Sequence, residues 1–485
     1  MRKFDFFILT FILFVALLFR LYKINIPLTD LHSWRQADTA AVARNFVKSG
    51  FDLLRPRYDD LSNVQSGQNN PQGYRMVEFP IYNAIFACLY KIFPIVSLEM
   101  WGRLISVFFS LITIAILYYL LLKESNRLAA FTGSLTYSIM PFFVFFSRVI
   151  LPESTALGFT MLSVFFLYLF LRKQYNNLPA GRQGITIHLL YILSLISFLL
   201  SLLIKPTIVF YGIPLFYLFY LKFKNKTLKN PLIYIFFLTA LLPLVLWRIY
   251  IAKFPEGIPV NEWLLTSVNT GGRLQKIFFR PSFFRWIFFE RINNLILGGY
   301  LTVFFIFGII AKRKNFFLHS CLLSSIFYLL VFQGGNVQHE YYQTLILPCL
   351  AIFTALGINF VLESKKLISY SISIFFISVI FIFSWYFSYF KVRDYYQYNQ
   401  ELVQEAKILN NLTQPEDKIV TDQMGDTTLL YLADRRGAPA IFKEPIDLKN
   451  LGYKYLITSN DTQKKRMGSD YEIIFENDKF TLYAL

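Results

Sequence analysis

The chain has 485 residues, of which 55% are hydrophobic, 19% aromatic and only 16% charged, and its mean hydropathy is +0.46. A soluble domain carries about 25% charged residues, so this composition excludes a single soluble globule. The abundance of Phe, Ile, Leu and Tyr excludes an intrinsically disordered chain, and the presence of only three Cys excludes a disulfide scaffold.

The net charge of +18 is unevenly distributed along the chain. The C-terminal tail, residues 391–485, holds 13 basic and 15 acidic residues, so residues 1–390 carry a net charge of +20. Excess basic charge within a hydrophobic segment is typical of membrane-protein loops, and we expect no nucleic-acid partner. Only 15 acidic residues remain in the first 390, which makes each of them worth considering for function.

Apolar runs of about 20 residues predict transmembrane helices. The sequence contains 11 such runs, at 4–22, 101–122, 128–147, 154–171, 186–204, 206–221, 231–252, 294–311, 316–333, 342–362 and 367–390. The first run follows Arg2 and Lys3, as a signal peptide would. It is too long, however, and Arg20–Lys23 contains no small-residue cleavage site, so we expect a retained anchor.

Short basic loops predict the orientation of these 11 spans. Lysines and arginines occur at 2–3, 123–127, 172–182, 222–229, 312–314 and 365–366, which all fall on one side. By the positive-inside rule this side is cytoplasmic and includes the N-terminus. The outer side then receives 23–100, 253–293 and the tail. We therefore expect a multi-pass cell-membrane protein whose tail is extracytoplasmic.

Two domains follow from this topology. Residues 1–390 form a mostly α, polytopic membrane domain, whose first outer loop is 23–100, and residues 391–485 form a small soluble α/β domain. In the tail, we expect a helix over 401–412 and strands at 418–421, 440–442, 455–458, 472–475 and 480–483. Pro415 and Gly437 are predicted to lie in turns.

The acidic residues of the membrane domain lie outside the predicted hydrocarbon region. In this topology none of them is deep in a span, and most lie in outer segments. A proton-coupled transporter usually needs an ionisable relay near the membrane midplane. The pattern therefore favours chemistry or binding at the outer interface.

The first outer loop contains a predicted helix. Ser33 followed by Gln36 fits a capping box, and Gly50 is a suitable residue to end the helix, which we expect to begin at Trp34. Such a helix N-terminus can receive a phosphate.

The same helix is amphipathic, because Arg35, Asp38 and Asn45 share one face. We expect it to lie on the membrane surface. An ordinary interfacial helix with a solvated Arg35–Asp38 pair is an equally good interpretation.

Four further segments bring charged residues to predicted outer ends of spans: Glu78–Phe93, Ser147–Glu153, Lys205–Thr207 and Gln338–Tyr342. Each has a structural interpretation. Glu78 can interact with a helix dipole, and Arg148 can pair with Glu153. Lys205 can reach the interface with its long side chain, and His339 can act as an interfacial anchor. The functional alternative for Lys205 is a cation that binds a lipid phosphate.

Taken in order, these segments resemble the polytopic GT-C glycosyltransferases, in particular the dolichyl-phosphate-mannose protein mannosyltransferases and aminoarabinose transferases. The likeness covers about the first 390 residues and is carried by 35–46, 78–82, 103–106, 147–153 and 339–348. Segment 78–82 is similar to the family's (E/H)-x-P-(L/I)-Y, and 103–106 is similar to its R-L-x-S. The resemblance implies a GT-C-like bundle of about 11 transmembrane helices with interfacial helices in the first outer loop.

One position departs from the family pattern. The family often has an Asp-Glu pair at the start of the first-loop helix, where this chain has Arg35-Gln36. The first-loop carboxylate is then Asp38, one turn later, or Asp30, just before the helix. Glu153 stands where the family usually has Asp.

The resemblance implies an inverting enzyme that moves a sugar from a polyprenyl-phosphate donor to an extracytoplasmic lipid, glycan or protein acceptor. A carboxylate would take the proton of the attacking group, and cations would stabilise the departing lipid phosphate. The implied catalytic carboxylates are Asp38 (or Asp30), Glu78 and Glu153. The implied donor-binding residues are Lys205, Arg148, Arg35, His339 and Tyr341.

The implied donor substrate is a lipid-phosphate-linked sugar, membrane lipids surround the protein, and no cofactor is firmly expected. Two or three carboxylates could hold a divalent cation, so a metal stays open. One alternative function is a lipid-linked sugar or polysaccharide transporter, which predicts charged or broken helices at mid-membrane. Another is a non-enzymatic membrane scaffold, which predicts no clusters of charge such as 148–153 and 339–340 in short outer segments.

Overall fold

The structure, a computed structural model, describes residues 2–172, 180–260, 281–312, 314–363, 369–468 and 470–485. It divides into two compact units, each described by itself. The helical unit comprises Met1–Ile24, Arg103–Trp247 and Leu264–Asp394, and the loop–tail unit comprises Asn25–Gly102, Arg248–Trp263 and Tyr395–Leu485. The tail therefore groups with the first loop. The predicted piece 253–293 and span 367–390 lie partly outside the described residues.

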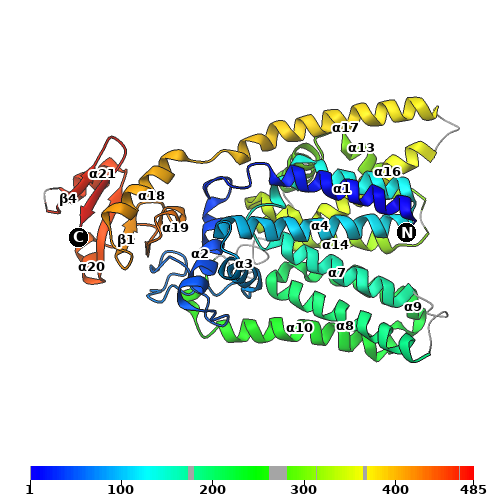
Figure 1. The fold of residues 1–485 in the computed structure, drawn as a ribbon, viewed down its shortest axis with the longest axis horizontal. Coiled ribbons are helices and arrows are strands. Elements are labelled where there is room, and N and C mark those ends of the chain that lie inside the picture. The colour runs from blue at the N-terminus through cyan, green and yellow to red at the C-terminus, as the bar shows by residue number, and fades with distance from the viewer. Residues whose placement is uncertain (1, 173–179, 261–280, 313, 364–368, 469) are drawn as a thin grey trace. The chain divides into compact units, whose positions relative to one another are not determined.

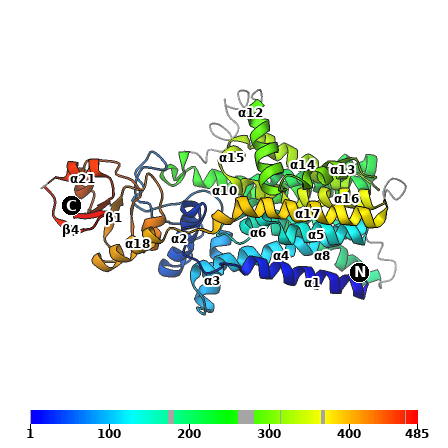
Figure 2. The same cartoon turned by 90° about the horizontal axis from the view of Figure 1, so that it is seen from above.

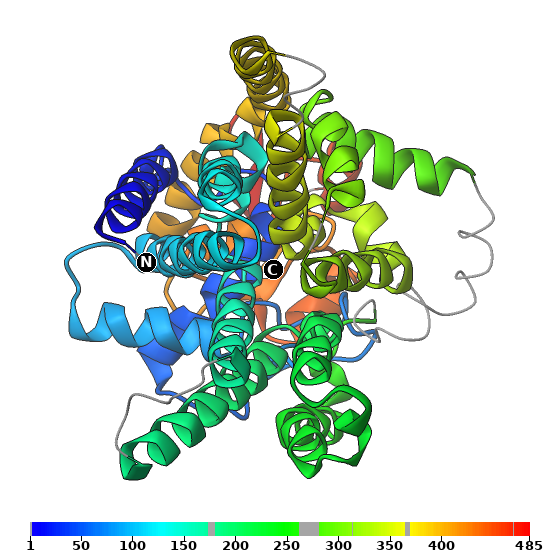
Figure 3. The ribbon, with the colours of Figure 1, turned by 90° about the vertical axis from the view of Figure 1, so that its right-hand side faces the viewer.

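The helical unit consists of long helices lying side by side (Figures 1 and 2). Figure 3 views them end-on, with α1 at the edge of the bundle. Its helices are α1 (Lys3–Leu21), α4 (Leu98–Glu124), α5 (Arg127–Ile139), α6 (Pro141–Phe146), α7 (Glu153–Arg172), α8 (Ala180–Ile204), η1 (Pro206–Tyr211), α9 (Gly212–Phe223), η2 (Lys224–Lys229), α10 (Pro231–Ile251), α12 (Pro281–Phe284), η5 (Arg285–Ile296), α13 (Leu301–Ile310), α14 (Phe317–Val331), α15 (Gln333–Gln338), η6 (Glu340–Ile346), α16 (Leu347–Glu363), α17 (Tyr370–Val392) and η7 (Arg393–Tyr396). Helices α4 and α10 each extend into the loop–tail unit at one end.

Among the described residues, seven helices are long and apolar enough to cross a membrane, or eight if one bent pair counts as a span. The seven correspond to the predicted spans 4–22, 101–122, 154–171, 206–221, 231–252, 342–362 and 367–390. The predicted span 294–311 falls in the bent pair, whose two parts differ in direction by 115°, and 186–204 and 316–333 are shorter apolar helices. Span 128–147 is split into α5 and α6 because the backbone is extended at Met140, immediately before Pro141.

Close helix packing in the helical unit depends on two glycines. A Cβ atom on Gly308 would lie 1.8 Å from the carbonyl oxygen of Phe353, and one on Gly357 would lie 1.7 Å from that of Phe304. Small residues of this kind allow membrane helices to approach backbone to backbone. They account for the close contact between α13 and α16.

The loop–tail unit combines helices of the first loop with the tail domain. Its elements are α2 (Ser33–Ser49), α3 (Ile81–Ile92), η3 (Pro255–Gly257), α18 (Gln400–Leu412), β1 (Lys418–Thr421), α19 (Thr428–Leu432), β2 (Arg436–Ala438), α20 (Pro445–Asn450), β3 (Tyr453–Thr458), α21 (Asp461–Met467), β4 (Ile473–Glu476) and β5 (Thr481–Ala484). The sheet order is β2-β1-β3-β5-β4, with β1 parallel to β2 and β3, and β5 antiparallel to β3 and β4. Consecutive residues of β1, Ile419 and Val420, face two separate apolar cores on opposite sides of the sheet.

The predicted tail elements are confirmed except for the strand at 440–442. The structure places this strand earlier, at β2, and it includes Gly437, which had been predicted as a turn residue. A Cβ atom at Gly437 would lie 1.8 Å from the carbonyl oxygen of Ile419, so the absence of a side chain permits close pairing with β1.

Two predictions for the first-loop helix are wrong. The N-cap of α2 is His32, in a left-handed conformation with φ 58°, and Ser33 is already helical, so there is no capping box. The helix does not present a solvated face, because Arg35 and Asp38 are buried and α2 packs against α3 and α19. Gly50 does end the helix, with φ 92°.

Candidate active site

In the loop–tail unit, Arg35 and Glu78 form one ion pair. Arg35 lies in the first turn of α2, and Glu78 lies just before α3, which packs against α2. Arg35 Nη2 is 2.8 Å from both Oε1 and Oε2 of Glu78, and the two side chains are only 6% and 14% exposed. Burial of this kind strengthens the electrostatic interaction and orients both groups.

Asp30 precedes α2 and is bound by a residue of its first turn. Gln36 Nε2 donates to Asp30 Oδ1 at 2.8 Å and to the Leu31 carbonyl oxygen at 3.0 Å. The Gln36 side chain therefore holds the segment before the helix, rather than closing the predicted capping box. Asp30 is 3% exposed.

Asp38 is 1% exposed, and protein groups bind both of its carboxylate oxygens. Thr427, from the tail, donates from Oγ1 to Asp38 Oδ1 at 2.6 Å, and Arg75 Nη2 forms an ion pair with Oδ2 at 3.0 Å. Neither Arg75 nor Thr427 was predicted. Thr427 carries no local signal, because it lies 389 residues from Asp38 in the sequence.

Another buried carboxylate, Asp60, lies in the same unit. Its oxygens accept hydrogen bonds from the amide and hydroxyl of Ser62 and from the Tyr58 hydroxyl, at 2.6–3.3 Å. Burial raises the pKa of Asp60 to about 6, although the bonds from Ser62 oppose this shift. No sequence pattern had singled out this residue.

In the helical unit, Lys205 and Glu153 form a buried ion pair. Lys205 lies between α8 and η1, and Glu153 begins α7. Lys205 Nζ is 2.8 Å from Glu153 Oε1, with side chains 6% and 2% exposed. The ammonium group also lies 5.3 Å from the centroid of the Tyr342 ring. The structural alternative of a snorkelling lysine is therefore wrong.

The His339–Tyr342 segment forms an aromatic stack next to this ammonium group. The ring of Tyr341 lies 5.3 Å from that of His339 and 4.8 Å from that of Tyr342, measured between centroids. Glu340 is bound by Arg291 of η5. Arg148 is fully buried, and its Nη1 donates to the Lys23 carbonyl oxygen at 2.9 Å.

The predicted site residues thus form two groups, one in each unit. Asp30, Arg35, Asp38 and Glu78 lie in the loop–tail unit. Arg148, Glu153, Lys205, His339 and Tyr341 lie in the helical unit. Chemically, the first group offers carboxylates held by donors, and the second offers a desolvated ammonium group beside aromatic rings. Across the described residues, no three His, Cys, Asp or Glu side chains meet as a metal would require, and we assign no metal.

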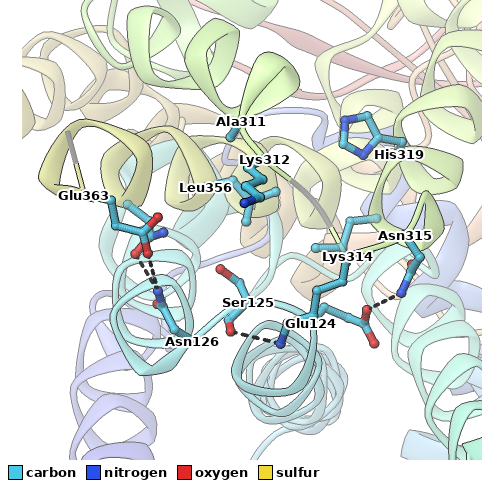
Figure 4. Close-up of a pocket in the computed structure, with 12 residues that line it drawn as sticks. Glu124, Ser125, Asn126, Ala311, Lys312, Lys314, Asn315, His319, Leu356 and Glu363 are labelled. Carbon is cyan, nitrogen blue, oxygen red and sulfur yellow. Dashed lines mark hydrogen bonds between the residues drawn. The ribbon is translucent and has the colours of Figure 1, made fainter.

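A polar cavity of about 260 Å³ in the helical unit contains none of these residues (Figure 4). The ends of α4 and α5, the segment between α13 and α14, and one face of α16 line it. Its carboxylates are bound by the protein, since Asn315 donates to Glu124 at 2.9 Å and Asn126 donates to Glu363 at 3.2 Å. We therefore do not include it in the candidate active site.

Known proteins share both sequence and fold with this chain. The family model of dolichyl-phosphate-mannose-protein mannosyltransferases matches residues 78–250. The structure of ArnT from Cupriavidus metallidurans in the apo state is 13% identical, with a TM-score of 0.66 over 98% of this chain and 97% of ArnT. ArnT bound to undecaprenyl phosphate is 15% identical, with a TM-score of 0.65 over the same shares.

An archaeal oligosaccharyltransferase has a similar fold. AglB from Archaeoglobus fulgidus, in complex with an inhibitory peptide and a dolichol-phosphate, is 13% identical, with a TM-score of 0.57 over 95% of this chain and 70% of AglB. No curated protein sequence matches the chain.

The fold and the matched segment are similar to those of multi-pass membrane glycosyltransferases. The chain has the fold of ArnT, and its residues 78–250 are similar to the mannosyltransferase family, as its resemblance to GT-C glycosyltransferases implied. The resemblance expected from the sequence is confirmed.

Proposed function

We propose that this enzyme transfers a sugar from a polyprenyl-phosphate donor to an extracytoplasmic acceptor, with inversion at the anomeric carbon. The observation that carries the proposal is the ArnT fold, which spans 98% of this chain and of which one solved example holds undecaprenyl phosphate. The match of residues 78–250 to the mannosyltransferase family supports it.

The donor phosphate binds at Lys205. A buried ammonium group, held by Glu153 and by the Tyr342 ring, can stabilise the negative charge that grows on the departing lipid phosphate. Arg148 is a further phosphate partner in the helical unit, and the His339–Tyr341 stack of the same unit lines the donor pocket.

The attacking group of the acceptor needs a carboxylate that accepts its proton. The two first-loop aspartates, Asp38 and Asp30, are the candidates for this role. Thr427 and Arg75 bind the oxygens of Asp38, and Gln36 binds Asp30. Glu78, oriented by Arg35, and Glu153 position the acceptor.

The loop–tail unit lies on the extracytoplasmic side in this proposal, and the N-terminus lies in the cytoplasm. The basic segments 2–3, 222–229 and 312–314 favour this orientation. An acceptor that is a lipid, a glycan or a protein then meets the donor at the outer interface.

The test uses the full-length protein in proteoliposomes that contain undecaprenyl-phosphate-linked sugars. Mass spectrometry should find free undecaprenyl phosphate and a glycosylated acceptor from cell-envelope extracts, and NMR of the product should show an inverted anomeric configuration. The Lys205→Met variant should lose transfer, whereas Lys253→Met, which alters an exposed lysine, should retain it. Movement of the intact lipid-linked sugar across the bilayer without its cleavage would instead identify a transporter.

A further inference from the structure

Among the contacts between the tail and the first loop in the loop–tail unit, two that are buried or partly buried lie at helix α2 and a third lies at residues 59–61. The first is the hydrogen bond from Thr427 to Asp38, in which both side chains are 1% exposed. A hydroxyl that donates to a buried carboxylate forms a short, charge-assisted bond, here at 2.6 Å. This bond fixes the residue that precedes α19 to the middle of α2.

The second joint lies two turns further along α2, at Arg44. Its Nη1 donates to the Tyr431 carbonyl oxygen at 2.6 Å, and its guanidinium lies 4.4 Å from the centroid of the Tyr431 ring. The Tyr431 hydroxyl in turn donates to Glu99 Oε1 at 2.5 Å. Arg44 also pairs with the fully buried carboxylate of Asp59.

The third joint extends the tail sheet by one segment of the first loop. Leu61 N donates to the Gly437 carbonyl oxygen at 2.7 Å, and Gly437 N donates to the Asp59 carbonyl oxygen at 2.9 Å. Residues 59–61 thus pair with β2 in parallel. Backbone pairing of this kind aligns two segments in register.

From these joints we infer that the tail is a clamp that sets the position of α2 for sugar transfer, and that Asp38 and Thr427 are positioning residues. The inference rests on the proposed function. Arg35 lies three residues before Asp38 on the same helix and holds Glu78, so a displacement of α2 moves this ion pair. A misplacement of such groups by about 1 Å is enough to lower the rate of a reaction.

If Asp38 is a positioning residue of the clamp, its variants should behave differently from those of a catalytic base. A positioning carboxylate acts only through its partners, so removing Thr427's hydroxyl should resemble removing the Asp38 charge. A base acts on the acceptor, so its loss should be far more severe than the loss of Thr427 and should alter the pH profile.

The experiment compares Thr427→Val, Thr427→Ser, Asp38→Asn and the double variant Thr427→Val/Asp38→Asn. The exposed Thr462→Val in α21 serves as the matched control. The clamp predicts that Thr427→Val lowers kcat for sugar transfer about tenfold, the factor that the loss of one charge-assisted hydrogen bond represents. Thr427→Ser and Thr462→Val should stay near the parent. The double variant should be no slower than the slower single variant, and the pH profiles should keep their shape.

Amide hydrogen exchange of α2 provides a readout that does not depend on activity. Faster exchange in Thr427→Val than in Thr427→Ser would support the joint even if no donor sugar were turned over, in which case only the proposed function would fail. The clamp is overturned if Thr427→Val exchanges faster at α2 but keeps full kcat, or if α2 exchange is unchanged. It is also overturned if Asp38→Asn abolishes transfer while Thr427→Val is normal, because Asp38 would then be the base.

Discussion

Loss of the Lys205 charge should cost both stability and activity, for separable reasons. In Lys205→Met the carboxylate of Glu153, 2% exposed, loses the ammonium group 2.8 Å away. At an effective dielectric constant of about 20, this separation corresponds to about 6 kcal/mol of attraction, offset in the native protein by the desolvation of both charges. Breaking a buried pair from one side costs about 3–5 kcal/mol, and we expect a loss of stability of this size.

A second substitution separates the structural contribution from the chemical one. In Lys205→Met/Glu153→Gln no uncompensated charge stays buried, so we expect most of the lost stability to return. Transfer should not return, because the cation that we propose for the donor phosphate is still missing. As a control, Lys48→Met breaks a pair with Asp434 whose side chains are 48% and 40% exposed, and should cost less than about 1 kcal/mol.

Unfolding of the purified protein in mixed micelles measures the free energies, and release of undecaprenyl phosphate measures transfer. A single variant Lys205→Met as stable as the parent would refute the argument from buried charge. A double variant with the parent's transfer rate would refute the assignment of Lys205 to the donor phosphate, whatever its stability.

Three further predictions concern stability. Burial raises the pKa of Asp60 to about 6, so the folded protein binds the proton of this carboxyl more tightly than the unfolded chain does. The stability that this proton provides is complete below about pH 4 and is lost as the pH rises through 6. The free energy of unfolding of Asp60→Asn, relative to the parent, should therefore rise by about 3 kcal/mol between pH 4 and pH 8, and a constant difference would contradict the burial of a charge. Gly357→Ala should separate α13 from α16 and lower the free energy of unfolding by about 1–3 kcal/mol or more, because its Cβ would lie 1.7 Å from the Phe304 carbonyl oxygen. Thermal unfolding measures this loss. Gly212→Ala is the neutral control, because its Cβ would lie 3.5 Å from the nearest atom, in ordinary contact. Arg435 is 3% exposed and donates five hydrogen bonds within the tail, so Arg435→Met should speed proteolysis of the tail, and an unchanged rate would count against its structural role.

Local patterns in the sequence predicted much of the local structure. Gly50 ends α2 as expected, because a left-handed residue is required there and only glycine adopts that conformation freely. The apolar runs coincide with helices, but a run does not reveal where a helix bends or breaks. Pro141 divided one predicted span, and the capping box failed because Gln36 binds Asp30 and Leu31 rather than the start of the helix.

Side-chain partners were harder to predict, because they depend on distant segments. Lys205 and Glu153 were each identified as candidates, but nothing in either segment indicated that they form a pair. The role of Asp38 was predicted from its position on one helix face. The structure shows instead that Arg75 and Thr427 bind it, and Thr427 lies in the tail, where no motif had been found.

The sequence by itself determined the class of protein, the membrane-spanning character and the segments in which charged side chains gather. These are properties of composition and of residues close together in the chain, so each can be recognised without knowing the fold. Only the tertiary structure decided which of those charges are buried, which neighbour neutralises each, and that the tail packs on the first loop. Such pairings depend on contacts across up to 389 residues of sequence, where no local periodicity carries information.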